Sequence, residues 1–175
     1  MARKPQGDVA EEVERRLLEI EQLKQDAAAR GLAFSAPTRE QLEKKIRRET
    51  GQSPYIYSMS WTSGTSAGSP AYYNLYAANP DPTGYYPVFV TIFFGLANFF
   101  DDLSEAVDAR DVRWPYVSSE PTYVAAGANL AASFSYTTPS GLPKGTYVAN
   151  AVLWAGQYHD KGVYFDRGLF YVTLL

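Results

Sequence analysis

The sequence contains no cysteine and a single histidine. The first absence excludes disulfides, thiolate metal sites and a thiol nucleophile. The one histidine, His159, lies beside Asp160, and no serine is framed by a Gly-x-Ser-x-Gly motif. A hydrolase triad needs a nucleophile, a base and an orienting group brought together. We therefore predict that the protein is not an enzyme, and a hairpin loop explains the segment around His159.

Long apolar runs and an excess of positive charge are also missing. The longest apolar stretch, residues 85–100, is interrupted by polar residues and proline, so it is too short and broken to span a bilayer as a helix. The basic residues near the N-terminus are not followed by the apolar stretch of a secretory signal. A net charge of −3 gives no reason to expect nucleic acid. We expect a protein that is cytoplasmic or assembled into a particle, with neither a nucleic-acid nor a membrane partner.

Two regions of different composition meet near residue 52. Hydrophobic residues make up 46% of the sequence, which is enough for a packed core. Residues 1–52 are dense in charge of both signs and hold one aromatic residue, Phe34, whereas all 14 tyrosines and all 3 tryptophans follow. Such a shift indicates a domain boundary. We predict a charged helical segment over residues 1–52 and a β domain over residues 53–175.

Helix start and stop signals occur twice in the first region. Asp8 with Glu11 has the spacing of a capping box, and Gly31 is suited to end the helix that follows. Thr38 with Gln41 repeats the capping-box spacing just after a proline. The pattern predicts two helices, one from near residue 8 and one from near residue 38.

Apolar residues recur along both predicted helices at spacings of three and four, which gives each helix one apolar face. The second stripe is too narrow to fold alone, and a lone charged helix is marginal in water. The helices therefore need a covering surface: their own β domain, the same helix in another subunit, or a different protein. The candidate docking or oligomerisation residues are Val13, Leu17, Ile20, Leu42 and Ile46.

After residue 52 the sequence period changes to two, which is typical of strands. The segment from Phe99 to Ala109 is the exception, because its apolar residues recur at helical spacing and predict a short helix or an irregular excursion. About seven short strands separated by turn signals indicate a sandwich or a barrel. The predicted strands are residues 55–61, 71–78, 87–94, 112–118, 129–136, 146–155 and 163–174.

The turns of this region resemble those of bacterial immunoglobulin-like modules. Asn79-Pro-Asp-Pro-Thr-Gly84 and its flanking strands are similar to their B–C hairpin, and Leu142-Pro-Lys-Gly-Thr-Tyr147 is similar to their E–F corner. Phe170-Tyr-Val-Thr-Leu174 resembles the closing G strand. The resemblance, to CARDB-like and fibronectin-type-III-like modules, covers residues 54–175. It implies an immunoglobulin-like antiparallel β-sandwich in which Tyr147 is the tyrosine-corner residue, with a hydroxyl bonded to upstream backbone.

Acidic residues gather between positions 101 and 111. In a helix Asp101, Glu105 and Asp108 share one face, and oxygen-rich clusters bind Ca²⁺. No calcium-loop pattern such as D-x-D-x-D-G accompanies them, so they are weak metal candidates, and a solvated helix face explains them as well. No glycine-rich phosphate loop is present, and we expect no cofactor.

Aromatic residues are the strongest remaining indication of function. They make up 15% of the chain, and exposed Tyr and Trp favour protein interfaces and sugar stacking. The leading hypothesis is a non-catalytic structural or protein-interaction module that docks onto a larger assembly, such as a virion decoration or fibre protein. Its partner is a protein, or another copy of the chain in a homo-oligomer. The alternative is a carbohydrate-binding module that uses Trp61, Trp114 and Tyr158. A third interpretation leaves the aromatic face covered by the helices, with nothing bound there.

Overall fold

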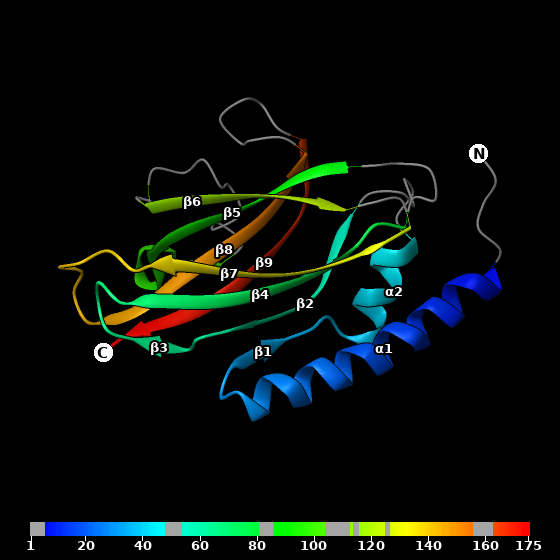
Figure 1. Ribbon diagram of the computed structural model, residues 1–175, viewed down its shortest axis with the longest axis horizontal. Coiled ribbons are helices and arrows are strands. Elements are labelled where there is room, and N and C mark those ends of the chain that lie inside the picture. Colours follow the sequence, from blue (N-terminus) through cyan, green and yellow to red (C-terminus); the bar gives the residue numbers. More distant parts are fainter. Residues whose placement is uncertain are drawn as a thin grey trace.

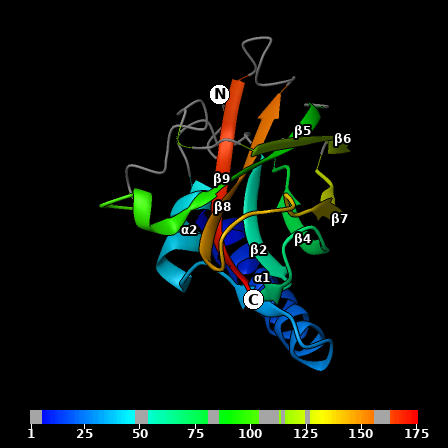
Figure 2. The same cartoon turned by 90° about the vertical axis from the view of Figure 1, so that its left-hand side faces the viewer.

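Two β-sheets packed face to face form the body of the protein, and two helices lie along one side of it (Figure 1, Figure 2). The computed structural model describes residues 6–47, 54–80, 86–103, 113, 116–124, 127–155 and 163–175. The elements within these ranges are α1 (Gln6–Ala29), β1 (Ala33–Ser35), α2 (Arg39–Arg47), β2 (Tyr55–Trp61), β3 (Gly64–Thr65), β4 (Pro70–Ala78), β5 (Tyr86–Leu96), the 3₁₀ helix η1 (Ala97–Phe99), β6 (Tyr116–Val124), β7 (Asn129–Thr137), β8 (Gly145–Ala155) and β9 (Val163–Leu174).

Sheet A has the strand order β1-β2-β4-β7, and sheet B has the order β3-β9-β8-β5-β6. All neighbouring strands are antiparallel except β3 and β9. The chain passes from sheet A to sheet B between β4 and β5, returns between β6 and β7, and passes to sheet B again between β7 and β8, while the short β3 of sheet B lies between β2 and β4 in the sequence. The interpretation of residues 79–84 as a hairpin turn is therefore wrong, because β4 pairs with β2 and β7 while β5 pairs with β6 and β8. This alternation between two antiparallel sheets is a Greek-key sandwich.

The main core fills the space between the sheets, as the period of two requires. Adjacent residues of one strand go to opposite faces: Phe94 packs in the main core, whereas Phe93 packs in a separate cluster that also holds Val148, Val152 and Trp154. Phe100, just after η1, joins that second cluster. The described part of the 99–109 segment is thus the end of a 3₁₀ turn followed by a bend, and residues 104–110 lie outside the described residues.

The ends of both helices follow local rules. At the end of α1, Leu32 N–H donates to the carbonyl of Ala27 and Gly31 N–H donates to that of Ala28, while Gly31 has φ 68°. This is a Schellman motif, and glycine adopts the left-handed conformation it needs without strain. At the start of α2, Gln41 N–H donates to Thr38 Oγ1 at 3.2 Å, and Thr38 N–H donates to Gln41 Oε1 at 3.0 Å. The reciprocal pair is the predicted capping box.

The apolar stripes of the two helices pack against the β domain of the same chain. Val13, Ile20, Leu42 and Ile46 are buried, and Leu17 is partly buried, against aromatic side chains of the outward face of sheet A. Tyr55 and Tyr57 of β2, each 1% exposed, are the main surface they cover. The five residues predicted to dock on a partner therefore form no free surface. Both helices are amphipathic, and the aromatic face of their own chain lies next to them in the fold.

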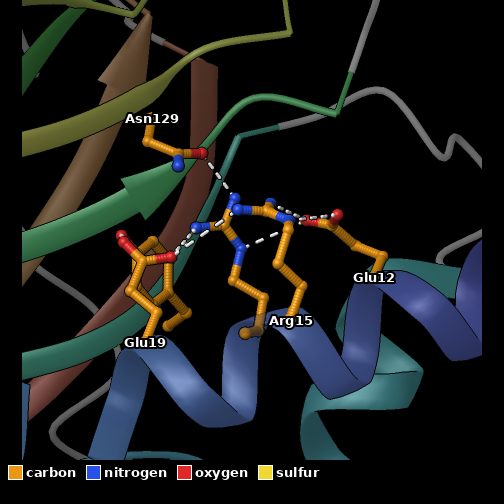
Figure 3. Close-up of polar contacts among 6 residues, drawn as sticks. Glu12, Arg15, Glu19 and Asn129 are labelled. Atoms are coloured by element: carbon orange, nitrogen blue, oxygen red, sulfur yellow. Dashed lines mark hydrogen bonds and ion pairs between the residues drawn. The ribbon is translucent and has the colours of Figure 1, made fainter. Parts of the chain in front are cut away.

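A buried arginine fastens α1 to the sandwich (Figure 3). Arg16 is 2% exposed, and its guanidinium donates to Glu12, to Glu19 and to the side-chain oxygen of Asn129 at the start of β7. The same guanidinium lies 4.3 Å from the centre of the Tyr57 ring. Two carboxylates and an amide oxygen accept its hydrogen bonds, and an aromatic ring lies against its guanidinium. These contacts offset the cost of burying the charge.

Most predicted elements are present, with shifted ends. β2 and β9 have the predicted bounds 55–61 and 163–174, and β4, β5, β7 and β8 extend their predicted strands by a few residues. α1 begins at Gln6 rather than near Asp8, and β6 begins at Tyr116 rather than at residue 112. The two short strands β1 and β3 were not predicted. Neither of the two helices that the structure describes is long and apolar enough to cross a membrane.

Candidate binding site

A polar site forms at the edge of sheet A, where α2 lies beside β2 and β9 (Figure 2). β1 pairs only with Met59–Trp61 of β2, and a bulge follows Ile56 at the other end. The N–H of Ile56 donates to Asp166 Oδ2 at 2.9 Å, and its carbonyl accepts from Lys45 Nζ at 2.9 Å. Lys45 Nζ also donates to Asp166 Oδ2 at 3.0 Å. This ion pair satisfies the backbone groups that a neighbouring strand would otherwise bond.

The Lys45–Asp166 pair also fixes the position of α2. Asp166 comes from β9 of sheet B and is 4% exposed, while Lys45 comes from α2. A buried carboxylate is stable only when it is paired and hydrogen-bonded, so removing either partner costs more than the pair contributes. The neighbouring elements α2 and β2 are therefore held at one point to β9, which is distant from both in the sequence.

A cavity of about 390 Å³ lies beside this ion pair. Its walls are residues 35–37, three side chains of α2, residues 56–59 of β2 and residues 167–169 of β9. Gly168 lets β9 approach β2 closely, since a Cβ atom there would overlap the sulfur of Met59. The cavity therefore lies at the seam between the two sheets, under α2.

Two polar atoms of the wall have no hydrogen-bond partner. Ser58 is 2% exposed, and its Oγ makes no hydrogen bond. Nη1 of the partly buried Arg167 is likewise buried without a partner. An unmet buried polar group costs about 1–3 kcal/mol, so two residues of one wall that each have such an atom are unusual.

Three residues of the wall are cations, and two of them have an ion-pair partner outside the wall. Lys45 is paired with Asp166, and Lys44 is paired with Glu40 at 2.8 Å on the exposed side of α2. Arg167 has no ion pair with any described residue. No Asp or Glu is among the described wall residues. The cavity offers hydrogen-bond donors and a net positive charge, which suits an electron-rich ligand group.

Tyr57 connects this wall to the helix network. Its hydroxyl donates to Glu19 Oε1 at 2.7 Å. Burial raises the pKa of Tyr57 well above its usual value, and the bond to Glu19 raises it further. Tyr57 is therefore neutral at physiological pH and acts as a fixed donor that ties β2 to α1.

The predicted site residues are not gathered in this cavity. Trp61 is 8% exposed, packs against Phe170, and donates its indole N–H to the carbonyl of Tyr171 at 2.9 Å. The expectation that Trp61 is an exposed sugar platform is therefore wrong, because its ring belongs to the core and its polar atom closes the seam. The other two members of that set, Trp114 and Tyr158, lie outside the described residues.

Only one of the three weak metal candidates lies within the described residues. Asp101 lies in an exposed bend, whereas Glu105 and Asp108 lie outside the described residues, as does His159. Within the part of the chain that the structure describes, no three His, Cys, Asp or Glu side chains are grouped as metal ligands.

Tyr147 has the contacts that the resemblance implies. It is 1% exposed, and its hydroxyl donates to the carbonyl of Pro143 at 3.0 Å. Its ring stacks on Phe94 with centroids 4.9 Å apart. The corner between β7 and β8 is thereby fixed to the main core.

Sequence reasoning did not find Ser58 and Arg167. The two residues lie near opposite ends of the β region in the sequence, and a single sequence does not show that β2 and β9 meet. One signal was present: Asp166-Arg167 is a charged pair in the middle of an otherwise apolar strand. Such a pair in a strand that packs in the core indicates a local polar contact.

Comparison with known proteins identifies the fold. The crystal structure of the C-terminal domain of wzt is similar, with a TM-score of 0.52 and 11% identity, over 82% of this chain and 78% of that chain. The chain has an immunoglobulin-like β-sandwich fold. The predicted fold class is thus confirmed. The CARDB domain of a Pyrococcus furiosus protein, solved in complex with di-metal ions, has a TM-score of 0.43 and 13% identity, over 70% of this chain and 86% of that chain.

No protein-family model and no curated protein matches the sequence. At these identities the structural likeness concerns the fold alone, and an immunoglobulin-like fold carries many unrelated functions. Function therefore has to be argued from the cavity.

Proposed function

We propose that the protein is a non-catalytic binding module. In this proposal the sandwich is a rigid scaffold, and the cavity between α2, β2 and β9 is its recognition site. The observation that carries the proposal is a cavity of about 390 Å³ whose wall includes Ser58 and Arg167, two residues that each have a buried polar atom without a hydrogen-bond partner. The immunoglobulin-like fold supports it, since such domains commonly serve as binding or interaction modules.

The proposal extends to the partner. The group recognised belongs to a protein component of a larger assembly, and a decoration or fibre role on a virus particle is one form of such docking. The helices contribute differently from the sequence hypothesis: their apolar stripes hold α2 in place, and α2 in turn supplies one wall of the cavity. In this proposal the partner binds at the cavity, and not at the apolar stripes of the helices.

The carbohydrate alternative has no observation in its favour. Its one described anchor, Trp61, is part of the core. We therefore retain a single proposed function.

Nuclear magnetic resonance of the labelled full chain tests this function directly. The protein is titrated with a panel of small neutral, anionic and cationic fragments, and backbone shifts are mapped onto the structure. We expect saturable shifts at Ser58, Gly168 and Leu169, with none at Ala131 and Ser133 on the exposed face of β7. If no fragment of any charge perturbs the cavity residues, the cavity is not a recognition site and the proposal is wrong.

A further inference from the structure

We propose that the protein forms a dimer in which β7 of one copy pairs antiparallel with β7 of a second copy, so that the two A sheets join into one. The inference goes beyond the proposed function, because β7 lies at the opposite edge of sheet A from β1 and needs no ligand in the cavity. Two observations carry it: the neutral, open edge of β7 and the blunting of the other sheet edges that the structure describes.

Three of the four sheet edges are short or interrupted (Figure 1). β1 has three residues and β3 has two. The part of β2 beyond β1 is closed by Lys45 and Asp166, which bond to its backbone. β6 has nine residues, but Glu120 and Pro121 stand in its middle. Short strands, charges and proline are the features by which natural sheets avoid pairing with other chains.

β7 is long and has none of these features. Its nine residues include no charged residue and no proline. Its ladder with β4 runs in register from Asn129 to Thr137 without a bulge, and β4 is uncharged too. Among the described strands β4 is its one neighbour in the sheet, so the other side of β7 is open. Such an edge is a template for a further strand.

Hydrogen bonds at the two ends of β7 show which of its backbone groups point outward. At one end, Asn79 N–H donates to the carbonyl of Ala128. At the other end, Thr138 N–H donates to the carbonyl of Ser69. Because such groups alternate along an antiparallel strand, the even-numbered residues of β7 bond to β4 and the odd-numbered residues direct their N–H and C=O groups away from it. The odd-numbered residues are Asn129, Ala131, Ser133, Ser135 and Thr137.

The same odd-numbered residues have the exposed side chains of β7, whereas the even-numbered side chains pack in the core. In an antiparallel pair with its two-fold axis at Ser133, each outward-directed residue faces another. The facing pairs are Ser133 with its own copy, Ala131 with Ser135, and Asn129 with Thr137. Every outward N–H then meets a carbonyl, and the facing side chains are all uncharged and none is aromatic.

A second copy of the chain is the partner that this edge fits. It supplies a strand of the same length with the same alternation and no like charge to oppose the contact. Two polar side chains of the strand are already bonded within their own chain, since Ser133 Oγ donates to Asn74 Oδ1 at 2.7 Å and Asn129 accepts from Arg16. The net charge of −3 is small, so two copies repel one another weakly.

Sedimentation velocity and amide hydrogen exchange of the full chain test the pairing. We expect a particle with twice the mass of one chain. In this dimer the amides of Ala131, Ser133 and Ser135 should exchange as slowly as those of Ala132 and Phe134, because both sets are hydrogen-bonded. In a monomer only the even-numbered amides bond to β4, so the odd-numbered amides would exchange rapidly.

Charge substitutions on the exposed side chains of β7 assign the interface. Ala131→Lys combined with Ser135→Lys places like charges opposite one another and should weaken the dimer about tenfold or more. The odd-numbered amides should then exchange rapidly while the even-numbered amides stay protected, which shows that the fold is kept. Ala131→Lys combined with Ser135→Glu places opposite charges across the interface and should restore the dimer. Leu18→Lys combined with Gln25→Lys is the matched control, since it adds the same charge at exposed positions of α1 and should leave the dimer unchanged.

Several results would overturn the inference. One is a full chain that stays monomeric up to about 1 mM. Another is a dimer that survives the two like charges on β7, or that the α1 control dissociates equally. Rapid exchange of the odd-numbered β7 amides in a dimer would show that the copies meet at another surface. None of these results bears on the cavity, which the fragment titration tests separately.

Discussion

Ser58 has a buried hydroxyl without a hydrogen-bond partner, which lowers the stability of the free protein. Its hydroxyl is fully enclosed, and neither the backbone nor a side chain bonds to it. Alanine at this position would keep the backbone and the packing while removing the unmet polar group. Ser58 also belongs to the wall of the cavity, whereas Ser60 on the same strand does not and bonds to Asn74.

Ser58→Ala should therefore stabilise the free protein. We expect the free energy of unfolding in urea to rise by about 1 kcal/mol, because an unsatisfied buried hydroxyl is removed. A matched change, Ser60→Ala, breaks the bond to Asn74 and should lower stability instead. A loss of stability in Ser58→Ala would mean that the hydroxyl has a structural partner.

Tyr147→Phe tests the corner between β7 and β8. The change removes the hydroxyl that donates to Pro143 and leaves the ring stacked on Phe94. We expect the free energy of unfolding to fall by about 1–2 kcal/mol, as for the loss of one buried hydrogen bond. Tyr72→Phe, at a tyrosine that is 54% exposed, is the control and should change stability little. A neutral Tyr147→Phe variant would contradict the assigned role.

α1 and α2 are parts of the folded unit rather than a free arm. α1 covers Tyr57 and is fastened by Arg16, and α2 is fastened by Lys45 and forms a wall of the cavity. A helix whose stripe is buried on its own sheet cannot offer that stripe to another molecule. The cavity therefore depends on both helices, although only α2 lines it.

Arg16→Met should weaken the attachment of α1. Methionine keeps much of the packing but removes the bonds to Glu12, Glu19 and Asn129. We expect the free energy of unfolding to fall by about 1–3 kcal/mol, less than for a fully buried pair, because the two carboxylates are partly exposed and contact Arg15 too.

Arg15→Gln provides the comparison for Arg16→Met. Arg15 is about half exposed, so its pairs with the same carboxylates contribute little, and we expect a change below about 0.5 kcal/mol. Urea denaturation of both variants measures the difference. If the two substitutions have equal effects, the buried arginine does not fasten the helix.

Local sequence patterns predicted the helices and strands better than they predicted which surfaces pack against one another. The capping box of Thr38 with Gln41 and the glycine stop at Gly31 act over a few residues, so sequence alone reveals them. The covering of Tyr55 and Tyr57 by the helices joins segments whose contact no local pattern encodes. The same limit hid the site, since Ser58 and Arg167 line one cavity only because β2 and β9 adjoin at the seam of two different sheets.

The whole molecule should lose stability in alkaline solution. Burial raises the pKa of Tyr57 and of Tyr136 above the usual value of about 10. Both groups stay neutral when folded but ionise when unfolded, so unfolding releases protons above that pH. Their contribution to stability is complete below about pH 10 and is lost as the pH rises toward the raised values.

Urea denaturation at several pH values between about 8 and 11 measures this dependence. We expect the free energy of unfolding to fall over the upper part of that range, and Tyr57→Phe should reduce the slope because one of the tyrosines with a raised pKa is removed. A free energy that stays constant, or a slope unchanged in Tyr57→Phe, would contradict the burial of that hydroxyl.

The central claim is that the seam of the sandwich holds a recognition site. The most direct test is the fragment titration of the labelled full chain, followed by nuclear magnetic resonance. The account predicts saturable backbone shifts at Ser58, Gly168 and Leu169, which line the cavity, and none at Ala131 and Ser133 on the exposed face of β7. Cavity residues that no fragment perturbs would contradict it.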